Sequence, residues 1–191
     1  MTTRSGSHHL RGAGRHKAAP ALVICMLSTG LLTLALHAQQ QPNVAAQRQA
    51  MKKLEFLVGH WSGTATVVRG PGEPLKLTQT EDVQFKLDGL VLLIEGTGHS
   101  VDGQAVYHAL ATISYDDAAN AYHFRAYNDG RYLDTALAVT PNTFDWGFTS
   151  GPVKVNNAMK LTDDGDWLET TEVAMGSAPP RRTVEMKLRR Q

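Results

Sequence analysis

The segment from Pro74 to Leu87 alternates without a break between two kinds of side chain. One row is mostly apolar but contains Gln79 and Glu81, and the other row, from Lys76 to Lys86, is wholly polar. Successive side chains of a strand point to opposite faces of a sheet, so this pattern predicts a long strand with one buried face and one wet face. A buried ionisable group must be paired, neutral, or in contact with a ligand or water. The row therefore predicts a barrel or sheet interior that is partly polar.

The period of two continues from His60 to the C-terminus, with turn residues about every ten positions. Strands are expected to begin near Trp61, Leu75, Leu90, Ala105, Ala121, Arg131, Thr143, Val153, Trp167 and Arg181. Only one helix is available to cover a sheet, so a sheet closed on itself is the simplest way to bury so many apolar faces. The predicted fold is all-β, an up-and-down antiparallel barrel of about ten strands with a short N-terminal helix. A two-sheet sandwich is the alternative.

The helix is expected over Asn43 to Val58, because Met51, Leu54 and Val58 fall at helical spacing and Gly59 follows as a stop signal. The resulting domain plan has three parts. It assigns residues 1–38 to a signal peptide, 39–59 to a linker and N-terminal helix, and 60–191 to the barrel.

The N-terminus carries the order of features found in a secretory signal. Four basic residues precede an uncharged, mostly apolar run from Ala18 to Leu36. Cleavage is expected after Ala38, with Ala35 as the second choice, and an uncleaved membrane anchor is the competing interpretation. We therefore expect a periplasmic or secreted protein that has no contact with the membrane once the signal is removed.

Removal of this segment changes the composition of the chain. The single cysteine, Cys25, is lost, which excludes disulfides, thiolate metal sites and cysteine nucleophiles from the mature protein. Loss of four of the 19 basic residues leaves 15 against 18 acidic residues, a net charge of about −3. Without a basic patch to neutralise phosphates, nucleic acid is not an expected partner.

The segment from Leu54 to Ala65 carries a resemblance to a known group. A short helix that runs into Leu57-x-Gly59-x-Trp61-x-Gly63 resembles the opening of the calycin superfamily, and above all bacterial exported lipocalin-like proteins. Glu95-Gly96 and the stretch Ile113 to Asp116, followed by Tyr122, resemble the middle of the same group. The resemblance implies a ligand-binding barrel in which Trp61 plugs the closed end, while Gly59 and Gly63 allow close approach of neighbouring backbone.

Haem barrels of the nitrobindin type are similar more distantly. They hold the haem iron with a histidine on the last strand, whereas the stretch from Arg181 to Arg190 contains none. Haem is therefore not expected, and no other cofactor is implied. The four histidines beyond the signal, His60, His99, His108 and His123, form no metal-binding motif, so no metal site is expected either.

The remaining candidates are residues that a ligand in the barrel would contact. They are Glu81, Gln79, Phe85, Glu95, His99, Arg125, Trp146 and Asn157. Glu81 lies on a clear inner row, while Glu95 and Glu169 lie on strands whose two faces are hard to separate. The expected function is binding of a small, mostly apolar molecule, because barrels of this size enclose a ligand-sized cavity.

Two other functions stay open at this point. The first is an enzyme that uses a buried carboxylate, Glu81, as acid or base on a small hydrophobic substrate. The second is a structural or partner-binding module whose barrel is filled by its own side chains. A pairing of Glu81 with Arg125 inside the barrel would make Glu81 a structural residue instead of a ligand contact.

Overall fold

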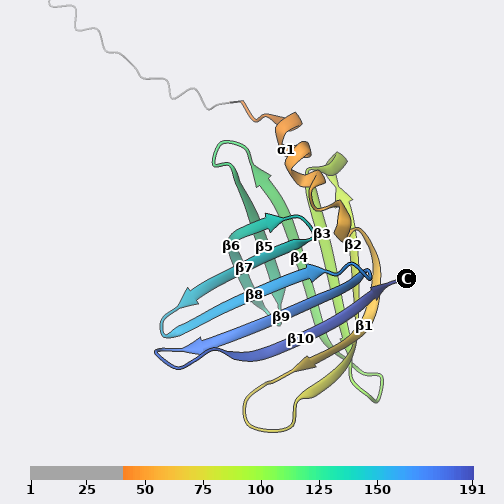
Figure 1. The fold of residues 1–191 in the computed structure, drawn as a ribbon, viewed down its shortest axis with the longest axis vertical. Coiled ribbons are helices and arrows are strands. Elements are labelled where there is room, and N and C mark those ends of the chain that lie inside the picture. Colours follow the sequence, from red (N-terminus) through yellow and green to blue (C-terminus); the bar gives the residue numbers. More distant parts are fainter. Residues whose placement is uncertain (1–40) are drawn as a thin grey trace, which may run out of the picture. The chain divides into compact units, whose positions relative to one another are not determined.

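The computed structural model describes residues 41–191, and these form a ten-stranded antiparallel barrel with a short helix at one end (Figure 1). The strands are β1 (Gly59–Val67), β2 (Leu75–Lys86), β3 (Val91–His99), β4 (Ala105–Asp116), β5 (Ala121–Asn128), β6 (Arg131–Thr140), β7 (Thr143–Ser150), β8 (Val153–Leu161), β9 (Asp166–Met175) and β10 (Arg181–Arg190). Each strand pairs with the next one along the chain, and β1 also pairs with β10. This closure confirms the barrel and excludes the sandwich. The signal predicted for residues 1–38 lies outside the described residues.

The N-terminal helix is shorter than the sequence pattern predicts. Helix α1 spans Val44–Lys52, and the side chain of Asn43 caps it by accepting a bond from the Ala46 amide at 3.0 Å. The prediction that it continues to Val58 is wrong, because the amides of Lys53 and Leu54 bond three residues back, which tightens the coil. A separate 3-10 turn, Glu55–Leu57, follows it. This tighter path buries Leu54 and Leu57 completely.

Residues of this segment and two tryptophans seal one end of the barrel. Trp61 and Trp167 are buried and meet edge to face, with ring centroids 5.4 Å apart. The indole of Trp61 donates to the Leu57 carbonyl at 2.7 Å, and the Arg190 guanidinium covers the same ring. Gly63 makes this end possible, because a Cβ there would lie 2.1 Å from the Lys187 carbonyl oxygen. The interpretation of Trp61 as a plug is thus confirmed.

The inner faces match the period-two rows. On β2, Leu77, Gln79, Glu81 and Val83 are buried, and their polar neighbours face outward. Corresponding rows from the other strands complete the interior, and Tyr122 of β5 ties the helix to the wall by donating to the Ala50 carbonyl at 2.7 Å. No helix in residues 41–191 is long and apolar enough to cross a bilayer.

The wall is incomplete between β6 and β7. Their pairing runs only from Thr140–Thr143 to Leu137–Trp146. By contrast, β5 pairs with β6 from Arg131 to Leu137, and β8 pairs with β7 along its full length. Beyond Leu137, the hydroxyl of Thr135 donates to the Gly147 carbonyl at 2.7 Å, and the two strands have no further ladder pairs. The strands β7 to β10 turn away from β6 in Figure 1, so the barrel widens toward the end opposite helix α1.

Candidate functional site

A cavity of about 980 Å³ occupies the wide part of the barrel. It extends from Trp167 and Phe144, near the sealed end, to Arg131, Ser150 and Val153, at the hairpins of the other end. This volume lies at the upper end of the range for small-molecule sites, which is about 300–1,000 Å³. The interior is therefore not filled by its own side chains, which argues against the filled-barrel alternative.

One wall of the cavity is built from small residues. Gly96, Ala109, Ala111 and Ala126, on the adjacent strands β3, β4 and β5, all line it. Side chains this short leave the space that larger residues would fill at the same inward positions. The cavity is thus encoded by residue size along three neighbouring inner rows.

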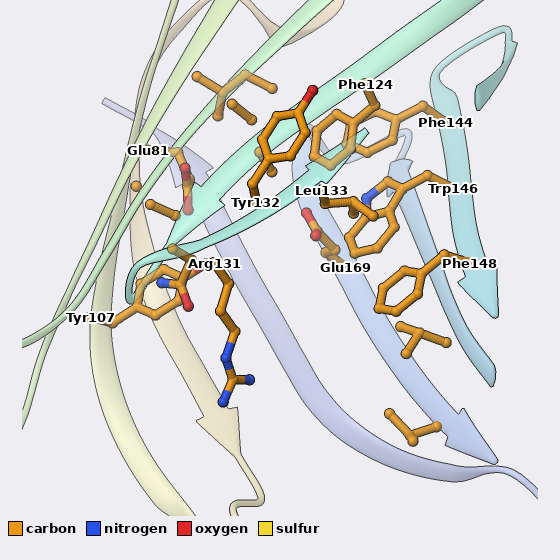
Figure 2. Close-up of a pocket in the computed structure, with 18 of the residues that line it drawn as sticks. Glu81, Tyr107, Phe124, Arg131, Tyr132, Leu133, Phe144, Trp146, Phe148 and Glu169 are labelled. Carbon is orange, nitrogen blue, oxygen red and sulfur yellow. The ribbon is translucent and has the colours of Figure 1, made fainter. Parts of the chain in front are cut away.

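Aromatic residues of β5 and β7 form another part of the wall. Phe124 and Trp146 stack with centroids 5.1 Å apart and an interplanar angle of 18°, and Trp146 and Phe148 lie at 6.5 Å and 3°. These three rings, here called the aromatic ladder, present nearly parallel faces. In Figure 2 Trp146 and Phe148 lie along one side of the cavity, with Glu81 and Tyr107 on the opposite side.

Glu81 is the polar group at the foot of the small-residue wall. It is 9% exposed and accepts a bond from the Gln79 amide at 2.8 Å. Gly96, directly across from it on β3, leaves the room it needs, because a Cβ there would lie 2.7 Å from both carboxyl oxygens. Burial, with a further contribution from the charge of Glu169, raises the pKa of Glu81 to about 8 against a usual 4.5, although the Gln79 bond opposes the shift.

Glu169 of β9 supplies a second carboxyl group to the same cavity. It accepts bonds from the Asn157 amide at 2.8 Å and the Trp167 indole at 2.9 Å. Burial raises the pKa of Glu169 in spite of these bonds. The amide of Asn157 also donates to the Thr171 hydroxyl at 3.0 Å, while its Oδ1 is buried without a partner among residues 41–191.

Tyr107 and Arg131 complete the polar lining. Burial, followed by the charges of Glu81 and Glu169, holds the pKa of Tyr107 well above its usual value, so the phenol stays protonated. Arg131, the first residue of β6, is exposed at the wide end. Among the described residues that line the cavity, it is the one basic side chain.

Four of the eight predicted contacts lie where the sequence pattern puts them, inside the barrel. Glu81 and Trp146 line the cavity, and Gln79 is buried beside Glu81. Asn157 is buried as well, but it reaches the cavity only through its bond to Glu169.

The other four predicted contacts do not line this cavity. Arg125 was expected to contact the ligand, but it points outward and pairs with Asp134 at 2.9 Å, which also excludes the alternative in which it pairs with Glu81. The reason is register, because the inner row of β5 runs through Phe124 and Ala126. Glu95 and His99 flank the inward Gly96 and Gly98 and therefore fall on the outer face. Phe85 is partly buried, packed against the core.

Sequence reasoning missed Tyr107, Arg131 and Phe148 as cavity residues, and it left the orientation of Glu169 open. Glu169 belongs to the row Trp167, Glu169, Thr171 and Val173, which could have shown that it points inward. The alternation was hard to recognise because β9 has hydrophobic residues on both faces. Arg131 continues the row of Leu133 and Leu137. Without this alternation, the sequence does not show whether a charged residue at the end of a strand points into the barrel or outward.

Comparison with known proteins places the fold and nothing finer. No protein-family model matches the sequence, and no curated protein is significantly similar to it. Among solved structures, the chain is similar to Rv2717c from M. tuberculosis, with a TM-score of 0.57 and 12% sequence identity. The match covers 74% of this chain and 97% of that one. At this identity the likeness shows a shared barrel architecture, and the site must be interpreted from its own residues.

Proposed function

We propose that this protein binds a small, mostly apolar molecule inside its barrel. The observation that carries the proposal is the cavity of about 980 Å³, with an aromatic ladder on one side and a few convergent polar groups on the other. Ligand sites are typically apolar hollows with a small number of placed polar groups that orient the ligand. The small-residue wall and the widened β6–β7 edge supply the space and the entrance.

The enzyme alternative has less support. A carboxylic acid or base that acts on a substrate generally works with a second titratable group held in hydrogen-bond contact. Within residues 41–191, the one side chain that bonds to Glu81 is the amide of Gln79. The site is therefore better suited to holding a ligand than to moving protons along a chain of groups.

The proposal includes membership of the calycin superfamily and export from the cytoplasm. The Leu57-x-Gly59-x-Trp61-x-Gly63 opening, with Trp61 at the sealed end of a barrel, supports the first part. The basic residues and apolar run before Ala38 support the second. N-terminal sequencing of the protein from its native host should begin near Gln39 or Leu36, and a mature chain that keeps Met1 or Thr2 would contradict export with cleavage.

Titration with an apolar fluorescent probe tests the binding proposal. The wild-type protein should bind such a probe at a stoichiometry of one. Ala109→Trp, which places an indole in the cavity, should abolish binding. The matched control is Ala136→Trp, on the exposed outer face of β6, which should bind like the wild type. Equal binding by both variants would mean that the probe lies outside the barrel and would refute the proposal.

A further inference from the structure

The two carboxyl groups of the cavity have no cation to pair with. Glu81 bonds only to an amide, and Glu169 bonds to an amide and an indole. Neither forms a salt bridge in the part of the chain that the structure describes. Buried carboxylates in proteins are usually paired, so the interior holds two acceptors whose natural complement is absent from the protein itself.

No cation lies next to Glu81 in the described residues, so a ligand could supply one. The flanking strands place Trp61 of β1 and Gly96 of β3 opposite it, and neither side chain is titratable. The other titratable or charged side chains that line the same cavity are Tyr107 of β4, Arg131 and Tyr132 of β6, and Glu169 of β9. Tyr132 is exposed, and its hydroxyl donates to Asp134 at 3.0 Å. Arg131 is exposed at the wide end, where water screens its charge, so the deep part of the cavity is acidic.

The aromatic ladder suits the same kind of ligand. The face of an aromatic ring carries negative potential and attracts ammonium groups, and it also stacks on flat apolar bodies. Phe124, Trp146 and Phe148 line the same cavity as Glu169 (Figure 2). An anionic ligand would instead meet two carboxyl groups and electron-rich rings.

We propose that the ligand is an amine: an organic cation with a flat apolar body that lies on the aromatic ladder and an ammonium group held by Glu81 and Glu169. This inference rests on the proposed function, since it names the class of molecule that the same cavity takes. Three N–H donors of a primary ammonium match the acceptors available on the two carboxyl groups.

Binding of such a cation is coupled to the loss of a proton. With a pKa of about 8, most Glu81 side chains carry a proton at neutral pH in the free protein. When the ammonium arrives, the O–H bond of Glu81 breaks, the proton passes to solvent, and the carboxylate pairs with the cation. No other bond changes. Affinity for the amine should therefore rise with pH up to the pKa of Glu81, and binding of the amine at neutral pH should release protons to the buffer.

Three probes that share one ring system separate the possibilities. Naphthylethylamine, naphthylethanol and naphthylacetate are titrated calorimetrically into the purified protein at about pH 6 and pH 8, in buffers of different ionisation enthalpy. The amine should bind at least about tenfold tighter than the alcohol at the higher pH, lose up to about tenfold in affinity for each pH unit below the pKa of Glu81, and release a proton. The alcohol should bind without a pH dependence.

Variants then assign the effect to Glu81. Glu81→Gln should remove the preference for the amine and the proton release, and it should leave the affinity for the alcohol unchanged. The alcohol titration doubles as a check that the variant is folded. Glu95→Gln, which changes an exposed carboxyl group on the outer face of β3, is the matched control and should behave like the wild type.

The outcomes distinguish the two proposals. Equal affinities for amine and alcohol, without proton release, would overturn the amine proposal and leave apolar binding in place. Tightest binding of naphthylacetate would also overturn it and would point to Arg131 as the recognition group. Failure of all three probes to bind would contradict the proposed function together with this inference. None of these comparisons among probes depends on the folding of a variant.

Discussion

Glu81 is a carboxyl group that the fold removes from water, and the cost of this burial depends on pH. The unfolded chain loses the proton near 4.5, whereas the folded protein keeps it up to about 8. Between these values the folded state binds more protons than the unfolded state, so the free energy of unfolding falls as pH rises. The contribution of Glu81 is fully present below 4.5 and is lost above about 8.

The first prediction follows from that window. Because the two pKa values differ, ionisation of Glu81 should lower the free energy of unfolding by at most about 5 kcal/mol as the pH rises from 4.5 to about 8. Urea denaturation at several pH values should show this decline in the wild type and a smaller one in Glu81→Gln, where the raised pKa of Glu169 still acts in the same direction. The lowered pKa values of Asp134 and Asp166 affect stability only at more acidic pH. Identical slopes for both proteins would contradict the burial of Glu81.

The second prediction concerns the contact between Gly96 and Glu81. A methyl group at Gly96 would lie 2.7 Å from both carboxyl oxygens, so Gly96→Ala must displace the carboxyl group or the strand. We expect a loss of about 1–3 kcal/mol of stability, typical of overpacking. The same substitution in a Glu81→Ala background should cost much less, because the clashing atoms are gone. A double-mutant cycle by chemical denaturation measures the difference, and additive effects would exclude the contact.

At the scale of elements, the edge between β6 and β7 is where the barrel opens. The third prediction is that backbone amides in Arg131–Thr135 and Phe148–Ser150 that face this gap exchange with solvent faster than those of Val139 and Phe144, whose strands are paired there. Hydrogen exchange resolved by residue measures this. Addition of a bound probe should slow exchange at the gap if the ligand enters there, and protection confined to the α1 end would place the entrance elsewhere.

The fourth prediction separates the sealed end from the cavity. Trp61→Phe removes the indole bond to Leu57 and part of the contact with Trp167, and should cost about 1–3 kcal/mol while leaving probe affinity unchanged. Trp146→Ala should do the reverse, weakening probe binding with a smaller effect on stability, because Trp146 faces the cavity. Denaturation and probe titration of both variants test this. Loss of binding in Trp61→Phe would show that the two regions are coupled.

The boundaries of the strands were predictable because turn chemistry is local. The expected starts at Leu75, Ala105 and Arg181 coincide with the observed ones, since glycine and aspartate mark the turns between strands. The end of helix α1 was not predictable in this way. Leu54 and Leu57 continue the helical spacing, yet they are buried through a 3-10 turn. The path of this turn is fixed by bonds from Trp61, on the next strand, and from the distant Arg190.

The faces of the strands were predictable where only one face is apolar, as on β2. They were ambiguous on β9, where Leu168 is apolar but points outward and is 38% exposed. The candidate site followed the same division. Glu81, Gln79 and Trp146 sit on clear rows, whereas Arg125 was assigned inward because a buried carboxyl group needs a partner, and the protein does not supply one.

For the molecule as a whole, the size of the cavity could not be predicted from the alternation of apolar and polar residues. Period two gives the direction of a side chain but not the distance to the opposite wall, which depends on strand number and on the widening at β6 and β7. Small residues at Gly96, Ala109 and Ala126 could equally line a tightly packed barrel. Only the assembled rows show that Trp146 and Phe148 lie on the other side of an open space.

The pairing of β1 with β10 bears on how the chain reaches this structure. Every other pairing joins strands that are neighbours in sequence, so each of them can form as a hairpin with a short loop to close. The β1–β10 seam joins the two ends of the described chain, where the Gln191 amide bonds to the His60 carbonyl at 2.9 Å. Its loop-closure entropy is the largest of any pair, and it is offset only when the intervening hairpins already hold the ends together. We therefore expect the seam to be the last part of the barrel to assemble. A circular permutant that keeps helix α1, joins the two ends of the described chain through a flexible linker and opens a distant hairpin would shorten the loop that this pairing has to close.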